Sequence, residues 1–330
     1  MRDSNTLAIY PLTDAANATD QFRIDVLEGL QKTSKSLLSK YFYDQQGDRL
    51  FQQIMKMPAY YLTKCELEIF QHQTATLAKA IEASKAPFEL IELGAGDALK
   101  SSFLLKHLLE QKIDFTYRPI DISGHILSEL EINLDEALPG LQIASLAGEY
   151  FEMLEKATQF SDRRKVVLFL GGNIGNMEVD EAYLFCSQLR SYLSPGDIVL
   201  IGFDLKKNPH QILEAYNDKS GITAAFNLNL LARINRELAG DLNLENFTHY
   251  QTYDPVTGAC RSYLVSLIEQ QAIIAGTKIN FAENELIAME ISQKFATEQI
   301  SAIAESAGFQ HQIAIGDSKN WFVDAIWMAR

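Results

Sequence analysis

Glu92, Gly94 and Gly96 fall within five positions and have the types and spacing of a ligand-binding turn. Glycine has no Cβ, so two glycines separated by one residue let a ligand lie against bare backbone. An apolar run from Phe88 to Leu93 precedes the glycines and predicts a buried strand, and Ala98 to Glu110 predicts a helix. A strand, a glycine turn and a helix in this order form the opening unit of a nucleotide-binding α/β sheet.

The residues around the glycines indicate which class of ligand this turn binds. Leu99 occupies the position of the third glycine in the dinucleotide fingerprint G-x-G-x-x-G, which disfavours a dehydrogenase. E-x-G-x-G is the form found in class I methyltransferases, which bind S-adenosylmethionine (SAM). SAM carries a positive sulfonium and no phosphate, so the Glu92 carboxylate is compatible with it. The motif therefore favours SAM over NAD.

Polar residues also follow three other predicted strands, at the end of an open α/β sheet where ligands bind. Asp121 is placed to accept hydrogen bonds from a ribose, or else to cap the next helix. Glu149 and Tyr150 follow the third strand, where an adenine amine would lie, with a solvated loop as the alternative. The loop from Gly171 to Asn176 holds two asparagines and three glycines, which offer amide donors and acceptors without charge.

The elements that must position these residues alternate between strand and helix after Pro87, which predicts a parallel sheet. Lys165 to Leu170 is a continuous apolar run, as expected for a central strand buried on both faces. Two closing strands, 309–315 and 321–328, match the antiparallel end of a class I methyltransferase sheet. The other predicted strands are 88–93, 115–122, 141–146 and 198–203, and the helices are 98–110, 124–137, 179–193 and 297–307.

This alternation stops after Asp204. The following segment predicts a hairpin around Asp254 to Gly258, within an inserted and partly antiparallel unit that covers the mouth of the sheet. Before the sheet, Thr63 and Glu66 form a capping-box pattern that predicts a helix over 64–83. The other predicted elements are helices at 20–31, 47–56, 210–216 and 223–238, and strands at 247–253, 259–268 and 272–281.

The expected fold class is therefore α/β, a Rossmann-like class I SAM-dependent methyltransferase sheet with an inserted α+β substrate-binding domain. We expect residues 63–206 and 295–330 to form the SAM-binding core and residues 207–294 the inserted domain. Residues 1–62 are expected to form an N-terminal helical segment that contributes to the substrate domain.

Composition limits the partners. The formal charge of −14 disfavours nucleic acid, because phosphate binding needs a basic face. The N-terminus has no apolar signal region and no apolar run approaches a membrane span, so we expect a cytoplasmic protein without a membrane partner. Cys65, Cys186 and Cys260 are odd in number and widely spaced, and the six histidines are scattered. Neither a disulfide framework nor a metal site is expected.

Longer motifs add a resemblance. Six segments carry it: KYFYDQQGDRLFQQI, MPAYYLTKCELEIF, IELGAGDALKS, FLGGNIGNM, AYNDKSGITAAFNLNLLARINREL and MEISQKF. In these segments and their order the chain resembles the ergothioneine-pathway histidine Nα-methyltransferases, SAM-dependent enzymes that trimethylate the histidine α-amine. The resemblance covers nearly the whole chain from about Lys35.

The resemblance implies which residues hold the cofactor. Lys100 would neutralise the methionyl carboxylate of SAM, or else be a solvated helix residue. The family usually has Asp-Phe where this chain has Glu149 and Tyr150, so the adenine contacts are expected to be longer or shifted. With the glycines of the turn and of the fourth-strand loop, the expected cofactor contacts are Tyr43, Gly94, Gly96, Lys100, Asp121, Glu149, Tyr150 and Gly171.

The resemblance also implies the substrate contacts. Asn176 and Tyr216 would hold the α-carboxylate and orient the amine, and Glu290 and Ser292 would bond the imidazole with help from Tyr60. Two residues apart in an extended segment, Glu290 and Ser292 point to the same side. Ser262 replaces a methionine of well-known members, which enlarges the pocket. Tyr60, Tyr216 and Phe226 supply aromatic faces toward a sulfonium and a quaternary ammonium product.

The expected reaction is an in-line displacement in which the neutral α-amine of histidine attacks the SAM methyl, giving hercynine and S-adenosylhomocysteine. Tyr60, Asn176 and Tyr216 are the expected catalytic residues, and alignment of the reactants is their main contribution. We expect a monomer that acts on a small amino acid. The alternatives are a methyltransferase for another aromatic amino acid, a modified histidine or a tryptophan derivative, and a non-catalytic SAM-binding protein.

Overall fold

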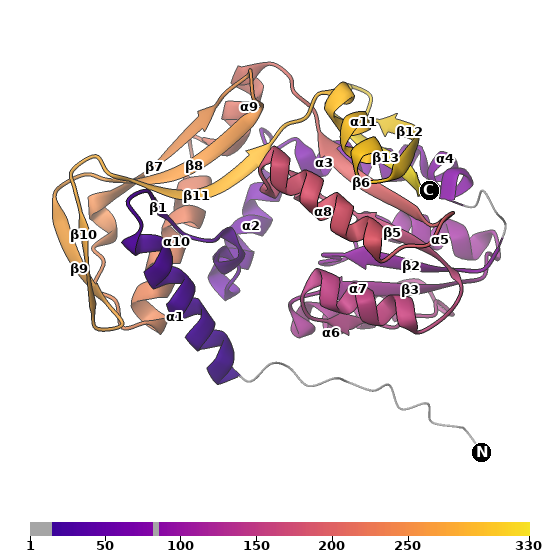
Figure 1. The fold of residues 1–330 in the computed structure, drawn as a ribbon, viewed down its shortest axis with the longest axis horizontal. Coiled ribbons are helices and arrows are strands. Elements are labelled where there is room, and N and C mark those ends of the chain that lie inside the picture. Colours follow the sequence, from indigo (N-terminus) through magenta and orange to yellow (C-terminus); the bar gives the residue numbers. More distant parts are fainter. Residues whose placement is uncertain (1–14, 82–85) are drawn as a thin grey trace.

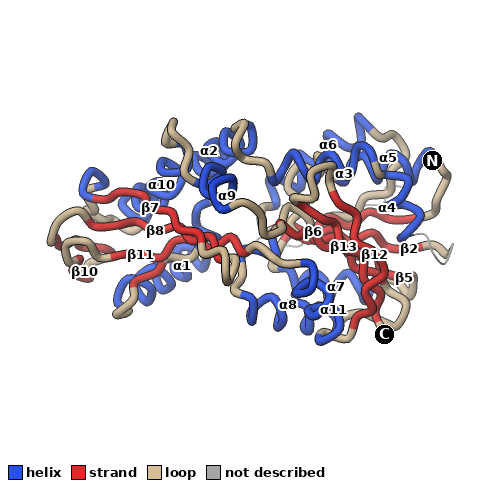
Figure 2. The backbone as a smooth tube through the Cα atoms, turned by 90° about the horizontal axis from the view of Figure 1, so that it is seen from above, coloured by secondary structure: helices blue, strands red, loops and turns tan. Residues whose placement is uncertain are grey.

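A seven-stranded sheet and a four-stranded sheet lie at opposite ends of an elongated molecule (Figures 1 and 2). The computed structural model describes residues 15–81 and 86–330, so the first fourteen residues and the end of the helix predicted to reach Ala83 lie outside the described residues. The seven strands follow the order β12-β13-β6-β5-β2-β3-β4. Their bounds are β2 Phe88–Leu93, β3 Phe115–Asp121, β4 Leu146–Ala147, β5 Arg164–Phe169, β6 Ile198–Asp204, β12 Phe309–Gly316 and β13 Phe322–Ala329.

The strand directions confirm the predicted sheet. β2 pairs in parallel with β3 and β5, and β5 pairs in parallel with β6. β13 runs antiparallel to both β6 and β12, as the two closing strands predict. Every residue of β2 and β6 is buried, including the two glutamates of β2, Glu89 and Glu92, as expected for strands covered on both faces.

Helices cover both faces of this sheet (Figure 1), and the alternation of side chains along each strand divides the core in two. Val166 and Leu168 of β5 pack on the face covered by α3, α4, α5 and α6, whereas Val167 and Phe169 pack toward α7, α8 and α11. The helix bounds are α3 Leu62–His72, α4 Thr74–Ile81, α5 Ser101–Glu110, α6 Gly124–Ala137, α7 Tyr150–Gln159, α8 Val179–Ser191 and α11 Thr297–Ser306.

The second sheet has the order β1-β11-β8-β7 and joins distant parts of the sequence. β1 pairs in parallel with β11, and β8 pairs with β7 in the hairpin predicted around Asp254 to Gly258. These strands are β1 Lys35–Ser36, β7 Phe247–Tyr253, β8 Ala259–Ser266 and β11 Leu286–Gln293. The neighbouring helices are α1 Ala15–Gln31, α2 Gln45–Lys56, α9 Pro209–Tyr216 and α10 Ile222–Glu237, with a short 3-10 helix η1 at Ser39–Phe42.

Four predicted elements are wrong in detail. The strand expected at 141–146 is only β4, preceded by an isolated bridge between Ile143 and Tyr117. The strand expected at 272–281 is a hairpin of β9 (Gln270–Ile274) and β10 (Thr277–Phe281), because the chain turns at two positive-φ residues, Ala275 and Gly276. The helix expected at 64–83 ends at His72 and restarts at Thr74, and α5 begins at Ser101. Helix α7 and strand β1 were not predicted.

Candidate active site

The glycine turn after β2 is tied to the end of β3. The Gly94 amide donates to the Ile120 carbonyl at 2.8 Å, and the Gly96 amide donates to the Asp121 carboxylate at 3.1 Å. Asp121 also accepts from the Ser123 amide at 3.0 Å, and Ser123 is the N-cap of α6. Asp121 therefore braces the turn and does not cap the helix itself.

The backbone of this turn is shaped for a ligand. Gly94 and Gly96 have φ values of +71° and +54°, where a side chain is unfavourable. A Cβ at Gly96 would meet nothing within 4 Å, so its backbone borders open space. A Cβ at Gly94 would lie 2.7 Å from the Tyr150 hydroxyl. The Tyr150 hydroxyl therefore packs against the Gly94 backbone, whereas Glu149 is exposed.

A buried ion pair lies beside the turn. Glu66 is fully buried and pairs with Lys100, and its two carboxylate oxygens share the Gly171 N–H at 2.9 and 2.8 Å. Lys100 is thus not a solvated helix residue, since only 19% of its side chain is exposed. The capping-box interpretation of Glu66 is wrong, because Tyr61 is the N-cap of α3 and Glu66 faces the sheet.

Two more acidic residues are buried in the seven-stranded sheet, Glu92 of β2 and Asp324 of β13. Glu92, the acidic residue of the E-x-G-x-G motif, is buried in the sheet and accepts from the Tyr117 hydroxyl at 2.5 Å. Burial raises the pKa of Glu92 to about 7, partly offset by that hydrogen bond. Asp324 of β13 is also buried, and neither of its carboxyl oxygens has a hydrogen-bond partner in the described chain. Burial and the charge of Glu66 raise its pKa well above the usual range.

Four of the predicted substrate contacts, Tyr216, Ser262, Glu290 and Ser292, line one cavity. It lies on one face of the four-stranded sheet, which we call the inner face and which carries Gln251, Ser262 and Glu290. There β11 and β8 pair in a register that places Glu290 opposite Ser262. The cavity is small, about 10 Å³, which is roughly the space of one water, so an amino-acid ring enters only when lining side chains move. The other lining residues are Thr223, Asn227, Gln251 and Cys260.

Ser262 is held inside a polar network. Its hydroxyl donates to the Asn227 side-chain oxygen at 2.8 Å and therefore accepts from Nε2 of His249, also at 2.8 Å. Burial lowers the pKa of His249, which keeps the ring neutral. Two buried atoms on the cavity wall, Oε1 of Gln251 and Oγ1 of Thr223, have no hydrogen-bond partner among the described residues. The wall beside Glu290 is therefore polar, and two of its atoms are available for hydrogen bonds to a ligand.

The Glu290 carboxylate is partly buried and has no hydrogen-bond partner within residues 15–81 and 86–330. Burial raises its pKa to about 7, and the positive charge of Lys294 opposes that rise. An unpaired acceptor with this pKa is suited to an N–H donor of a ligand.

A second buried network joins the cavity to the seven-stranded sheet. The Tyr216 and Ser292 hydroxyls lie 2.7 Å apart, and the Lys294 ammonium donates to both, at 2.8 and 2.7 Å. Lys294 also pairs with Asp204, which accepts from the Tyr61 hydroxyl at 2.8 Å. Sequence reasoning missed Lys294 and Asp204 as site residues. Lys294 follows Ser292 by two positions in an extended segment, and Asp204 comes directly after the strand predicted at 198–203, so both signals were present in the sequence.

Aromatic side chains surround the space between these networks. The Tyr60 and Tyr216 rings meet edge to face with centroids 5.9 Å apart, and Tyr43 meets Phe226 in the same way at 5.9 Å. Desolvation raises the pKa of Tyr43 well above its usual value, with further contributions from Glu290, Tyr60 and Tyr150. Tyr43 is nevertheless 44% exposed, so part of it borders open space.

Asn176 is placed apart from the other predicted substrate contacts. It ends the 3-10 helix η2 (Asn173–Asn176), is exposed, and its side chain has no hydrogen-bond partner in the described part of the chain. The η2 turn packs on β11, since a Cβ at Gly175 would lie 2.8 Å from the Gln293 carbonyl oxygen. Asn176 thus lies beside the end of β11 but does not line the Glu290 cavity.

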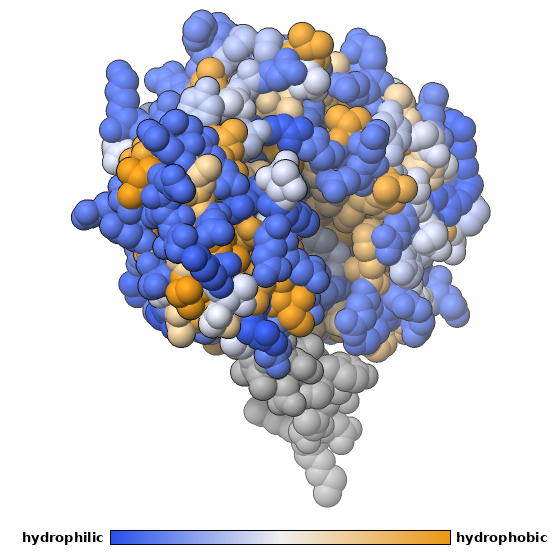
Figure 3. Space-filling view, turned by 60° about the vertical axis from the view of Figure 1, so that its left-hand side comes forward, coloured by the Kyte–Doolittle hydropathy of each residue, from blue (hydrophilic) through white to orange (hydrophobic). Residues whose placement is uncertain are grey.

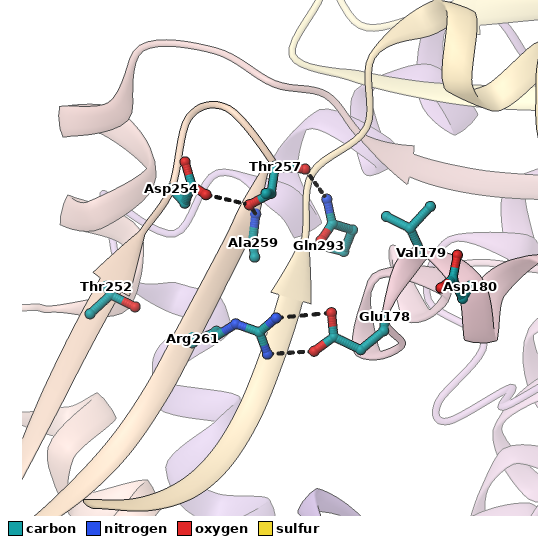
Figure 4. A pocket seen from close by; sticks show the side chains of 9 residues that line it. All are labelled: Glu178, Val179, Asp180, Thr252, Asp254, Thr257, Ala259, Arg261 and Gln293. Carbon is teal, nitrogen blue, oxygen red and sulfur yellow. Dashed lines mark hydrogen bonds and ion pairs between the residues drawn. The ribbon is translucent and has the colours of Figure 1, made fainter.

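A larger cavity, about 390 Å³, opens on the other face of the four-stranded sheet (Figure 4). Arg261 and Thr252, which line it, alternate with the inward-facing Ser262 and Gln251. A two-pronged ion pair between Arg261 and Glu178 crosses it (Figure 4). None of the predicted site residues lines this cavity.

Among residues 15–81 and 86–330, no group of three or more His, Cys, Asp or Glu side chains is placed to hold a metal ion. In the same residues, no helix has the length and apolarity to span a membrane. Cys65, Cys186 and Cys260 are free thiols and are buried.

A sheet of this order, with a glycine turn after its central strand and an acid at the end of the next, defines a class I SAM-dependent methyltransferase. The open backbone at Gly96 and the carboxylate of Asp121 fit that cofactor. A family profile described as "Histidine-specific methyltransferase, SAM-dependent" matches residues 22–329, and the chain belongs to this family.

Named relatives have related activities. The chain is 33% identical to a histidine N-alpha-methyltransferase of Mycolicibacterium smegmatis, over 92% of this chain and 94% of that one. It is 28% identical to ergothioneine biosynthesis protein 1 of Schizosaccharomyces pombe, over 86% of this chain and 38% of that one. It is also 28% identical to L-tryptophan methyltransferase trpM of Psilocybe serbica, over 89% of each.

Proposed function

We propose that this SAM-dependent methyltransferase methylates the α-amino group of L-histidine, and that three successive transfers give hercynine for an ergothioneine-type pathway. The observation that carries the proposal is the polar cavity in which Glu290 and Ser292 lie side by side. A ring that offers both a donor and an acceptor suits these two partners, and imidazole is such a ring. The names of the histidine-methylating relatives support the same substrate.

In this proposal the chain's main task is alignment. Bound SAM supplies an electrophilic methyl group on its sulfonium. Glu290 accepts an imidazole N–H and Ser292 bonds the other side of the ring, while Tyr216 and Asn176 hold the amino-acid end. Tyr60 and Phe226 shield the site from water and face the positive charge. Holding two reactants in line can contribute an effective molarity of roughly 10⁵–10⁸ M.

The cofactor site of the proposal is the space beside the glycine turn. Its proposed contacts are Tyr43, Gly94, Gly96, Lys100, Asp121, Glu149, Tyr150 and Gly171. Asp121 would accept from the ribose with the lone pairs that its two backbone bonds leave free. Lys100 would face the methionyl carboxylate, with Glu66 holding it in place.

We also propose that residues 63–206 and 295–330 form the SAM-binding core, 207–294 the inserted substrate domain, and 1–62 a segment that completes the latter. The pairing of β1 with β11 supports the last assignment. We propose a cytoplasmic monomer without nucleic-acid or membrane partners. On the face shown in Figure 3, hydrophobic residues form small patches separated by hydrophilic ones, which supports a monomer.

The test is incubation of the purified chain with SAM and each of the twenty amino acids, followed by mass spectrometry of the products. We expect S-adenosylhomocysteine release with histidine and a product that carries three added methyl groups. Preference for tryptophan would favour the trpM-like alternative, against which the polar cavity wall argues. SAM binding without turnover of any amino acid would contradict the proposed activity.

A further inference from the structure

Lys294 is a fully buried cation whose three N–H groups all have partners. It lies just after β11, where the chain returns from the four-stranded sheet to the seven-stranded one. Its ammonium contacts the Asp204 carboxylate at 2.7 Å and the hydroxyls of Tyr216 and Ser292. A buried charge is costly unless it is paired in this way, and apolar side chains would fill the same space without that cost.

The bonds of Lys294 determine what the two hydroxyls can do. An ammonium has no lone pair, so Tyr216 and Ser292 must both accept from it. They also share one hydrogen bond with each other, which uses one of their two protons. The remaining proton has no acceptor among the described residues. It is left for a ligand, so the pair presents one donor beside the Glu290 acceptor.

We propose that Lys294 is a positioning residue for the substrate ring: it holds Tyr216 and Ser292 as acceptors, so that they present a single donor opposite Glu290. Neutral imidazole has one N–H and one bare nitrogen, which matches one acceptor and one donor. Indole has no bare ring nitrogen and leaves the donor unpaired. This inference rests on the proposed function, because it assigns the ring selectivity of the same site.

The charge of Lys294 also acts on Glu290. The ionisable groups whose pKa Lys294 affects include Tyr60, Tyr253 and Cys260, and its direct partners are Asp204 and Tyr216. Lys207, which pairs with Asp204 from its other side, keeps that carboxylate compensated when Lys294 is removed. Removing Lys294 takes away the charge that opposes the rise in the pKa of Glu290. That pKa must then rise further, and Glu290 is protonated over a wider pH range.

The experiment compares Lys294→Met with a control, Lys206→Met. Lys206 is a nearby lysine whose ammonium donates to the Val256 carbonyl at the surface, away from the Glu290 cavity. We expect Lys294→Met to raise the KM for histidine about 10- to 100-fold, the effect of a lost hydrogen bond to a charged group. In the pH profile of kcat/KM, the acid limb of Lys294→Met should move to higher pH. The affinity of this variant for SAM should stay within about twofold of wild type. Its preference for histidine over tryptophan should fall.

Two further variants keep the test decisive. If Lys294→Met does not fold, Lys294→Gln is measured instead, with the shift of the acid limb as its readout. This variant removes the charge, leaves the ion pair of Asp204 with Lys207 intact and supplies an amide to the buried hydroxyls. Ser292→Ala should combine with Lys294→Met less than additively, since both act on one hydroxyl. A folded variant with wild-type histidine KM, pH profile and ring preference would overturn the role of Lys294. Absence of histidine turnover by the wild-type chain would refute the proposed function, and the same comparison is then made with the amino acid that the chain does methylate.

Discussion

Glu290 shows how a single carboxylate can be prepared for a ligand. It has no hydrogen-bond partner in the described structure, and burial raises its pKa to about 7 while Lys294 opposes the rise. Its strand register places it opposite Ser262, and Ser262 is occupied by Asn227 and His249. Glu290 and Gln251 of this cavity wall thus each offer an acceptor oxygen without a partner in the described chain, and of these Glu290 can carry a negative charge.

This pKa leads to a pH prediction. As pH falls through about 7, Glu290 takes up a proton and accepts an N–H less well, so kcat/KM for histidine should fall on the acid side. The amide that Glu290→Gln introduces cannot titrate, so this variant should lose the acid limb that Glu290 causes. In this variant, the pH dependence of kcat/KM that remains should be the one set by ionisation of free histidine itself. Its kcat/KM should be about 10- to 100-fold lower at pH 8. Steady-state kinetics from pH 5.5 to about 9 checks both.

SAM affinity is the control for this prediction, because Glu290 is not among the proposed cofactor contacts. Calorimetric titration of Glu290→Gln with SAM should give the wild-type dissociation constant. Loss of SAM binding together with histidine turnover would contradict the assignment of Glu290 to the substrate ring.

Among single residues, those that follow a predicted strand or lie in a motif could be predicted from the sequence as site residues. Those that act through a tertiary contact could not. Asp121 and the glycines were predicted at the sheet edge, where the structure has them. Glu66 fitted a capping box because its spacing from Thr63 is right, and spacing cannot show which way a helix face points. Its contact with Gly171 joins residues 105 positions apart, a tertiary contact that no local pattern encodes.

At the scale of elements, the glycine turn between β2 and α5 forms one wall of the proposed cofactor site. Helix α5 begins at Ser101 and not at Ala98, because Gly96 and Ala98 both have positive φ and extend the loop. The hairpin within 270–281 was likewise hidden, since Gly276 turns a stretch that otherwise reads as one strand. Strands buried on both faces were predicted well, because their continuous apolar runs need no partner to be recognised.

The turn gives an element-scale prediction for Gly94→Ala. The positive φ should cost about 1–2 kcal/mol of unfolding free energy, and the new Cβ would crowd the Tyr150 hydroxyl at 2.7 Å. We therefore expect lower stability and at least about tenfold weaker SAM binding. Gly196→Ala is the matched control, since Gly196 has φ +91° and no neighbour within 4 Å of the added Cβ. Equal SAM affinities in the two variants would argue against Tyr150 and Gly94 sharing a ligand.

At the scale of the molecule, buried and exposed bridges connect the two sheets. The buried bridge runs from Asp204 of β6 through Lys294 to Ser292 of β11. The exposed bridge is the ion pair of Arg261 in β8 with Glu178 at the start of α8, whose side chains are 38% and 45% exposed. Charged pairs so open to water contribute little, typically 0–1 kcal/mol, so the buried bridge should dominate.

A double-mutant cycle tests this ranking. Glu178→Gln and Arg261→Gln should couple by less than about 1 kcal/mol in urea unfolding, and the coupling should shrink further in about 0.5 M salt. Methyl transfer to histidine should remain near the wild-type rate in both variants. Coupling above about 2 kcal/mol that salt does not reduce would show that the exposed pair behaves as a buried one.

The pairing of β1 with β11 bears on how the chain is made. Lys35 and Ser36 lie against Ile287 and Ala288, so about 250 residues must leave the ribosome between the two halves of this edge. Closing so long a loop is slow compared with forming a helix. The nascent chain therefore completes the wall around Glu290 late, after the central parallel strands have already been synthesised.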